Sequence, residues 1–277
     1  MEPISSTMRA SLFLGMFLVC LLLEGLFPLR MTTQPKSKRL IMNLAFAAIG
    51  LIVLRLTFLR LVFFVSNIST QNQWGLLYLI NLPYPLEILL GLFLMDYTFY
   101  FWHVANHKIS FLWRFHNVHH VDLDMDVSTA SRFHAGELIL STPFRSLQIV
   151  VFGIDPFTWI VFETLVVVST QFHHSNIRFP ERWERFLCKI IVTPRMHGIH
   201  HSIIQQETDS NFSTIFSFWD KIQRSFKWGI PESDIMIGVA AYRDPKELTL
   251  IKLLILPFRR PRAWKLPDGR IPTRPSH

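Results

Sequence analysis

Long apolar runs and short polar segments alternate along the chain, and this pattern predicts membrane-spanning helices. The first two runs cover residues 10–29 and 40–65, and each is long enough to cross the hydrocarbon core of a bilayer. A third helix is expected over residues 85–107, because a proline stands at its first position. At 1.5 Å per residue, about 22 residues cover roughly 33 Å, which is enough to cross the membrane and extend past it.

A second apolar stretch, residues 138–170, predicts a helical hairpin. Residues 138–153 enter the membrane and residues 156–170 return, although Pro143 and Arg145 make the first arm an imperfect span. With the hairpin included, the chain has about four transmembrane helices. Because the hairpin adds no net crossing, the polar segments before and after it face the same compartment.

Composition agrees with an all-α integral membrane protein. Half of the 277 residues are hydrophobic, 25 are Phe, and only 17% are charged, which is too apolar for an ordinary soluble domain of this size. The net charge of +8 is carried at the ends of apolar runs and in the tail, so we expect a membrane surface as partner and no nucleic acid. Cys20 and Cys188 lack a Cys-x-x-Cys pattern and predict no disulfide framework.

The loop charges predict the orientation of the chain. The loop after the first run contains Arg30, Lys36, Lys38 and Arg39 and no acid, whereas the loop at residues 66–75 has no charge. The positive-inside rule therefore places the first loop in the cytoplasm and the amino terminus outside. We expect a multi-pass protein with a helical, histidine-rich cap on the cytoplasmic side.

The polar segments contain the candidate chemistry, because eleven of the twelve histidines lie between His103 and His201. Residues three and four apart share one helix face, so a cluster with this spacing directs two or three imidazoles toward one point. For any single histidine, a buried ring satisfied by hydrogen bonds is the simpler interpretation, but the repeated spacing favours a metal site. The three clusters are His103 and His107, then His116, His119 and His120, then His197, His200 and His201.

Imidazole is a ligand that suits zinc, copper, iron and nickel. With two further histidine sites between the clusters, about ten nitrogens are available, whereas two four-coordinate zinc ions would use about eight. Two metals of higher coordination number fit better, and iron is the obvious candidate. Neighbouring polar side chains should orient the rings and offset the metal charge, although Asp96 can equally be an interfacial acid solvated by water. The candidates for this role are Asp96, Asp124, Glu137, Asn176 and Asp209.

The ordered motifs resemble the fatty acid hydroxylase and sterol desaturase superfamily over roughly residues 90–226. They comprise His103 and His107, "LWRFHNVHH" at 112–120, "RFHAGE" at 132–137, "HHSNIRFP" at 173–180, "TPRMHGIHHS" at 193–202, "ETDSNF" at 207–212 and "FWDKI" at 218–222. The resemblance divides the chain into an N-terminal transmembrane region at 1–89, a catalytic domain at 90–226 that includes the hairpin, and a basic cytoplasmic tail at 227–277.

The resemblance implies a ligand set position by position. It adds His134 to the three clusters, although Ala135 and Gly136 replace the more usual residues after it. It also adds His174, which directly precedes Ser and Asn as in the family pattern, and leaves His173 as an extra histidine. The implied metal ligands are His103, His107, His116, His119, His120, His134, His174, His197, His200 and His201.

Members of this superfamily are membrane enzymes with a non-haem di-iron centre that use O2 and two electrons to hydroxylate or desaturate a lipid. The resemblance thus implies a lipid substrate such as a sterol or fatty acyl chain, two iron ions, and a cytochrome b5, ferredoxin or flavoprotein reductase as electron donor. The sequence contains no cysteine cluster and no Gly-x-Gly-x-x-Gly, so the electrons should come from outside the chain. Zinc can replace iron in a purified sample, because imidazoles bind it well.

Two other classes of protein are alternatives. A membrane zinc-dependent lipid hydrolase would also carry histidines at the membrane face, but about three protein ligands per zinc would leave several histidines unexplained. A metal transporter would place ionisable residues within its spans, whereas the histidines here follow the ends of the predicted spans.

Overall fold

The computed structural model describes residues 5–274, with only the backbone for residues 57–59. The described residues are helical and form no β-strand, which confirms the all-α prediction. The α-helices are α1 (Ser6–Leu26), α2 (Lys36–Val53), α3 (Leu59–Gln71), α4 (Tyr84–Lys108), α5 (Ser110–His120), α6 (Ala135–Phe152), α7 (Pro156–His174), α8 (Glu181–Leu187), α9 (Pro194–His200), α10 (Gln205–Thr208), α11 (Phe218–Ile222) and α12 (Leu250–Ile255). Short 3-10 helices are η2 (Leu76–Leu79), η3 (Val127–Ser131), η4 (Glu232–Asp234), η5 (Pro245–Glu247) and η6 (Leu256–Phe258), and a π-helical segment (Leu54–Phe58) joins α2 to α3.

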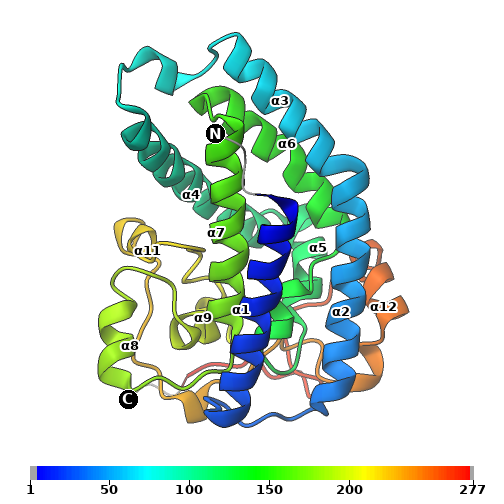
Figure 1. Ribbon diagram of the computed structural model, residues 1–277. Coiled ribbons are helices and arrows are strands. Elements are labelled where there is room, and N and C mark those ends of the chain that lie inside the picture. The colour runs from blue at the N-terminus through cyan, green and yellow to red at the C-terminus, as the bar shows by residue number, and fades with distance from the viewer. Residues whose placement is uncertain (1–4, 275–277) are drawn as a thin grey trace.

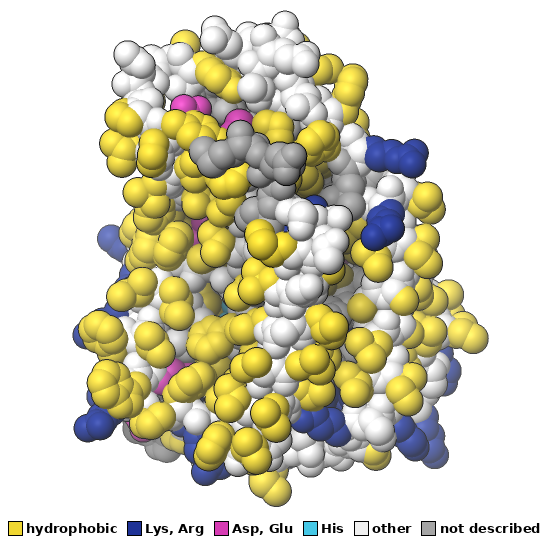
Figure 2. Space-filling model, viewed as in Figure 1, with side chains coloured by type: hydrophobic (Ala, Val, Ile, Leu, Met, Phe, Trp, Pro, Cys, Tyr) yellow, Lys and Arg dark blue, Asp and Glu magenta, His cyan; other side chains and the backbone are white. Residues whose placement is uncertain are grey.

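The long helices form one bundle, and the short helices gather at one end of it (Figure 1). Helix α1 packs on α7, α3 packs on α6, and α4 contacts α5, α6 and α7. Helices α8 to α12 surround the ends of α4, α5 and α7, and we call this end the cap (Figure 1). Apolar side chains cover much of the face around α1, and Lys and Arg side chains gather along its lower edge at the cap (Figure 2).

Three helical stretches among the described residues are long and apolar enough to cross a membrane. They are Ser6–Leu26, Lys36–Leu56 and Tyr84–Lys108, close to the three predicted runs. The second run is longer than predicted, because the π-helical segment carries the helix on into α3. These helices indicate a membrane protein.

The hairpin at residues 138–170 is present as α6 and α7. Gly153 ends α6 in the left-handed conformation at φ 75°, and the Asp155 side chain caps α7 by accepting from Phe157 N and Thr158 N. Arg145 and Glu163 form an ion pair between its arms. Neither arm is among the three stretches that meet the length and hydropathy criteria within residues 5–274, so a fourth span remains a prediction.

The α6–α7 turn lies at the end of the bundle opposite the cap. There Ser66 Oγ donates to Ile154 O at 2.8 Å. Gly75 has φ 121°, and a Cβ on it would lie 2.0 Å from Gly153 N. Because any side chain at either glycine would collide with the other loop, these two positions hold α3 against the hairpin.

Charged side chains at the cap end of α2 join the bundle to the cap. Arg39 is buried, donates to both carboxylate oxygens of Asp122 at 2.9 and 2.8 Å, and also pairs with Asp126. Arg30 pairs with Glu232 at 2.7 Å and Lys36 with Glu24 at 2.8 Å. Arg30 and Arg39, two of the basic residues between the first two apolar runs, therefore also hold the cap, and Lys36 joins α2 to α1.

Candidate metal centre

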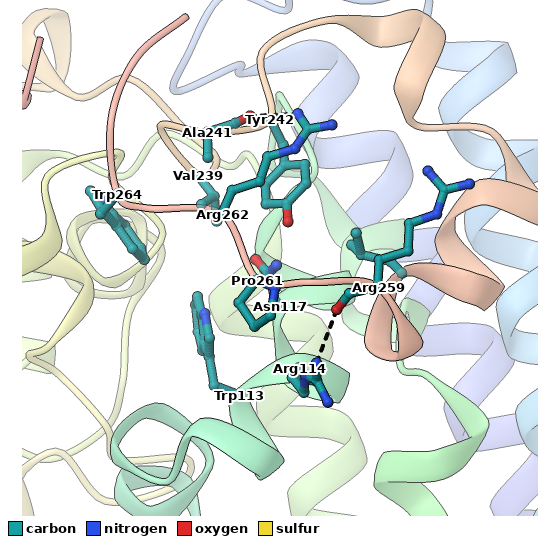
Figure 3. A pocket seen from close by; sticks show the side chains of 11 residues that line it. Trp113, Arg114, Asn117, Val239, Ala241, Tyr242, Arg259, Pro261, Arg262 and Trp264 are labelled. Atoms are coloured by element: carbon teal, nitrogen blue, oxygen red, sulfur yellow. Dashed lines mark hydrogen bonds between the residues drawn. The ribbon is translucent and has the colours of Figure 1, made fainter. Parts of the chain in front are cut away.

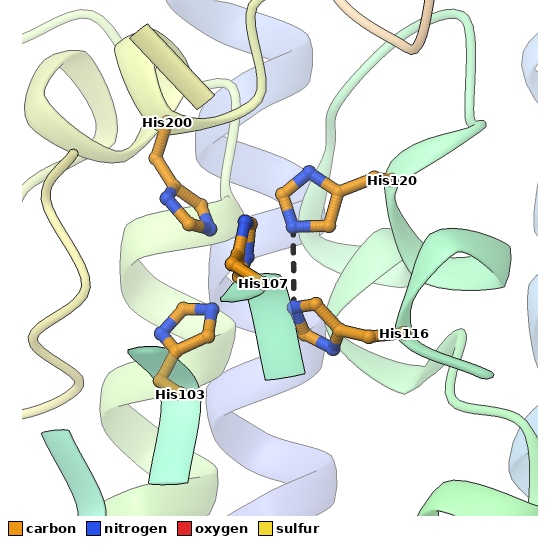
Figure 4. Close-up of side chains that lie close together, drawn as sticks. All are labelled: His103, His107, His116, His120 and His200. Carbon is orange, nitrogen blue, oxygen red and sulfur yellow. Dashed lines mark hydrogen bonds between the residues drawn. The ribbon is translucent and has the colours of Figure 1, made fainter. Parts of the chain in front are cut away.

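Nine histidines converge in two adjacent groups. Within each group the candidate ligand atoms, one from each residue, all lie within 4.8 Å of one another. The five-histidine group contains His103, His107, His116, His120 and His200, and the four-histidine group contains His119, His174, His197 and His201. Figure 4 shows the rings of the first group turned toward a common centre.

The five-histidine group depends on the junction between α4 and α5. Ile109 breaks the helix with an extended backbone (φ −91°, ψ 112°), so that α5 turns back along α4. His103 and His107 share one face of α4, and His116 and His120 share one face of α5. His200, near the end of α9, completes the group.

Two pairs of adjacent histidines are divided between the two groups. Consecutive residues on a helix point about 100° apart, so His119 and His120 face different centres, as do His200 and His201. The rings of His120 and His201 stack at 4.2 Å with 13° between their planes. A His-x-x-His-His motif therefore supplies both groups at once and brings them next to each other.

Oxygen atoms around the groups fix the tautomers of four rings. Because a carbonyl oxygen only accepts, a ring nitrogen bonded to it carries the proton, and the other nitrogen presents its lone pair. Nδ1 contacts a backbone oxygen in His103 (Phe212 O, 2.6 Å), His200 (Ser210 O, 2.7 Å) and His174 (Thr170 O, 2.8 Å). His116 Nδ1 lies 2.8 Å from Glu137 Oε1.

The ring nitrogens that face the centre of each group lie close together, as they would around a metal ion. In the four-histidine group, His174 Nε2 lies 2.9 Å from His119 Nε2 and 3.0 Å from His197 Nε2. In the five-histidine group, Nε2 of His107 and of His200 are buried without a hydrogen-bond partner among the described residues. Buried, converging lone pairs from an all-imidazole set fit a transition-metal ion.

Burial also keeps these rings neutral, as a metal ligand must be. Desolvation, followed by repulsion from the neighbouring imidazoles, lowers the pKa of His119, His120 and His197 well below the ordinary histidine value. The same two causes lower the pKa of His201. These four rings are therefore held in the neutral form that can bind a cation.

His134 lies outside both groups, unlike the placement expected from the resemblance. It is the N-cap of α6, where its Nδ1 accepts from Gly136 N at 2.9 Å while its Nε2 lies 3.0 Å from Leu254 O. Both ring nitrogens are thus engaged. The structure gives His134 a capping role because helix α6 begins directly after it.

His173 is buried beside the four-histidine group but is not one of its members. Its ring centroid lies 4.1 Å from that of His197 and 4.7 Å from that of His174, and it interacts with the backbone of Thr214. His174 therefore lies within the group and His173 outside it, and the choice of His174 as the ligand stays a prediction.

Two of the five side chains expected to orient the rings lie beside a histidine. Glu137 contacts His116, and Asp209 lies 3.9 Å from His107 Nδ1. The other three bind backbone groups instead. Asp96 accepts from Ile215 N and Phe216 N, Asp124 from Thr33 N and Gln34 N, and Asn176 exchanges hydrogen bonds with the backbone of Arg30.

The backbone carbonyls of Ser210 and Phe212 are orienting groups that no side-chain pattern reveals. They belong to the "ETDSNF" segment, whose shape depends on two side chains. Asp220 accepts from Phe212 N at 2.7 Å and Ser213 N at 3.0 Å, and Asn211, at φ 52°, donates to Met196 O. The non-histidine motifs at 207–212 and 218–222 thus hold a loop that positions His103 and His200.

Comparison with known proteins agrees with this geometry. The fatty acid hydroxylase family model matches residues 88–225, which include all nine grouped histidines. Human cholesterol 25-hydroxylase is 29% identical over 139 residues, 49% of this chain and 49% of that protein. Ornithine lipid hydroxylase OlsE of Rhizobium tropici is 26% identical over 159 residues (57% and 46%), and alkylglycerol monooxygenase of Danio rerio is 26% identical over 180 residues (62% and 37%).

The chain spans about half the length of the cholesterol 25-hydroxylases that it matches. No solved structure matches it.

Proposed function

Because the chain belongs to the fatty acid hydroxylase and sterol desaturase superfamily, we propose that it is a membrane oxidoreductase that hydroxylates a lipid with O2 at a centre of two iron ions. The observation that carries the proposal is the pair of buried imidazole groups. Two groups of five and four rings supply more nitrogens per site than a zinc hydrolase needs, since catalytic zinc uses about three protein ligands. They also lie at helix ends in the cap, where a transporter path through the spans would not require them.

The nine grouped histidines would hold the metals, and iron bound there would supply the O2-dependent oxidation of an unactivated C–H bond. The overall reaction consumes one lipid C–H, O2, two electrons and two protons, and yields one C–OH and water. The chain's own groups orient and protect the site. Glu137 and the carbonyls of Phe212 and Ser210 hold the proton on Nδ1 of His116, His103 and His200.

A lipid is the substrate class that the fold and the relatives favour. The candidate membrane helix α4 carries His103 and His107 in its last two turns, and α7 ends with His174, so the site lies where membrane helices end and a lipid in the bilayer would be near it. The similar proteins carry the names of sterol, ornithine lipid and alkylglycerol oxygenases. These names favour hydroxylation over the desaturation that the superfamily also includes.

The test of this function compares metals directly. Apo protein is loaded with Fe(II) or Zn(II) and supplied with lipid extract, 18O2 and an electron-donor system. We expect incorporation of labelled oxygen into a lipid with iron only, because zinc has no redox chemistry. Turnover with zinc, or without reductant, would contradict the oxygenase and support the hydrolase.

A further inference from the structure

A basic surface covers the outer side of the five-histidine group. It is formed by the side chains of Arg114, Lys252, Arg259, Arg260 and Arg262, which line two adjoining pockets (Figure 3 shows the first). Among the described residues that line these pockets, the acid is Glu247, which pairs with Arg262 at 2.7 and 2.8 Å. We call this set the basic rim.

The rim is built largely from the C-terminal tail, beyond the residues that the family model matches. Arg114 Nη2 donates to Arg259 O at 3.1 Å, which fastens the tail to α5. Arg262 lies over the ring of Tyr242 at 4.7 Å. The side chains of Lys252, Arg259 and Arg260 are exposed. The rim is therefore a positioned surface with cations available to a partner.

Two tryptophans connect the rim to the histidines. Trp113 and Trp264 line the first pocket, and their ring centroids are 5.8 Å apart. The Trp113 ring lies 5.1 Å from the ring of His107 and 5.4 Å from that of His120. Trp264 donates its Nε1–H to Ile203 O at 2.6 Å, which fixes its position. Trp113 thus reaches from the pocket to the five-histidine group, with Trp264 as its aromatic neighbour.

We propose that the basic rim docks an acidic one-electron donor protein with a haem or iron–sulfur centre, and that electrons enter through Trp264 and Trp113. This inference rests on the proposed function. The hydroxylation needs two electrons per C–OH formed, so two donor molecules are each oxidised by one electron, while O2 is reduced to the hydroxyl oxygen and water. Positive charge on the rim raises the rate at which an acidic partner arrives in the correct orientation.

A lipid surface is the other partner that basic side chains could meet, since Ile251 and Phe258 nearby are 73% and 72% exposed. The tryptophan contacts favour the donor, because lipid binding would not require aromatic rings leading to His107 and His120. The two partners give different results in the same experiment.

The first test measures binding of two probes, a soluble cytochrome b5 haem domain and a plant-type ferredoxin, to the full-length protein in nanodiscs. Arg259→Glu with Arg260→Glu should weaken the binding of at least one probe by about tenfold at low salt, and the difference should shrink at high ionic strength. The matched control is Arg182→Glu in α8 with Lys189→Glu just after it, on the other side of the cap (Figure 1). The control should keep wild-type affinity.

Equal donor affinity in the rim variant and the wild type would overturn the proposal. The same holds if the rim variant loses affinity only for phosphatidylserine vesicles. Turnover driven by dithionite and a viologen mediator bypasses docking and should be the same in the rim variant and the wild type. Absence of mediator-driven turnover in the iron-loaded wild type would instead contradict the proposed function, and donor binding would still test the rim.

The second test concerns the tryptophans. Trp264→Leu should bind donor and metal as the wild type does but lose most donor-driven turnover. Trp264→Phe also removes the bond to Ile203 O but keeps an aromatic ring, and it should lose less. Equal losses in the two variants would exclude the aromatic route.

Discussion

At the scale of single residues, the hydrogen-bond partners of the two ring nitrogens decide whether a histidine in this cap can bind a metal. His116 and His134 both make two polar contacts, but with different results. Nδ1 of His116 faces the carboxylate of Glu137, and its Nε2 faces His120 at 3.2 Å. His134 uses Nδ1 as an acceptor for Gly136 N, and its Nε2, the nitrogen that faces the centre in His116, lies 3.0 Å from Leu254 O, so both nitrogens are engaged. The contact made by each ring, rather than its residue type, separates candidate ligands from structural histidines.

Glu137 provides a direct test of ring orientation. Glu137→Ala should lower metal affinity by about 10- to 100-fold, the usual cost of losing such a partner, and Glu137→Gln should lose less because its amide oxygen still accepts. Competition with a chelator measures the affinity, and Glu181→Gln on the surface serves as control. Unchanged affinity in Glu137→Ala would show that the contact with His116 does not orient a ligand.

His134 should prove to be a cap rather than a ligand. His134→Ala should keep full metal content but lose about 1 kcal/mol of stability, because α6 loses its N-cap acceptor. His134→Asn can accept the same hydrogen bond and should recover much of that loss. Metal analysis and thermal unfolding measure the two effects, and loss of metal in both variants would restore His134 to the ligand set.

The two neighbours His173 and His174 should differ in the same assay. His174→Ala removes a ring whose Nε2 lies 2.9 Å from His119 Nε2 and 3.0 Å from His197 Nε2, so it should lower metal content and abolish turnover. His173→Ala should keep both metals. The opposite pattern, with metal lost only in His173→Ala, would reverse the assignment.

At the scale of elements, the ends of helices position the site. The break at Ile109 folds α5 back on α4, and the α6–α7 turn lets the hairpin return His174 to the cap. That turn depends on Gly75 and Gly153, both at positive φ and in contact with each other's loops. The bundle can therefore be weakened far from the histidines without touching a ligand.

Gly75→Ala tests this dependence. Its Cβ would lie 2.0 Å from Gly153 N, so the loop must move, and we expect a loss of more than about 1 kcal/mol in stability. Gly25→Ala is the control, because a Cβ there meets no atom within 4 Å among the described residues. Thermal unfolding in detergent should show a clear drop in midpoint for Gly75→Ala only, and equal midpoints would contradict the packing argument.

At the scale of the whole molecule, the bundle contains the candidate membrane spans and the cap contains the two histidine groups. The candidate spans α1 and α2 lie alongside the cap, whereas α4 extends from the cap to the opposite end of the bundle (Figure 1), and the histidines lie at the cap. Under the two proposals, the lipid would reach the centre from the bundle and the electron donor from the basic rim.

Reporter fusions test which side of the membrane the cap faces. A fusion at Asn72, in the loop opposite the cap, should be active only with an extracytoplasmic reporter, because the first loop carries the positive charges. A fusion at the carboxyl terminus should be active only with a cytoplasmic reporter. A cytoplasmic signal at Asn72 would invert the topology and place the cap outside.

The sequence by itself determined the class of protein and the identity of most candidate ligands. Hydrophobic runs predicted α1, α2 and α4 within a few residues, apart from the extension of the second run into α3, because a helix in a bilayer must satisfy its own backbone. The histidine spacing singled out eight of the nine rings that converge, and the resemblance added His174. These features are local, since they depend on which residues stand three or four apart.

Only the tertiary structure decided how the rings are shared and supported. His119 and His120 belong to different groups because neighbouring side chains on a helix diverge by about 100°. Each group is completed by histidines from segments far away in the sequence, such as His200 beside His120 and His174 beside His119. The carbonyls of Phe212 and Ser210, the capping role of His134, and the backbone bonds of Asp96, Asp124 and Asn176 all depend on chain packing. Backbone oxygens leave no trace in residue type, so no sequence pattern of histidines and acids could have identified them.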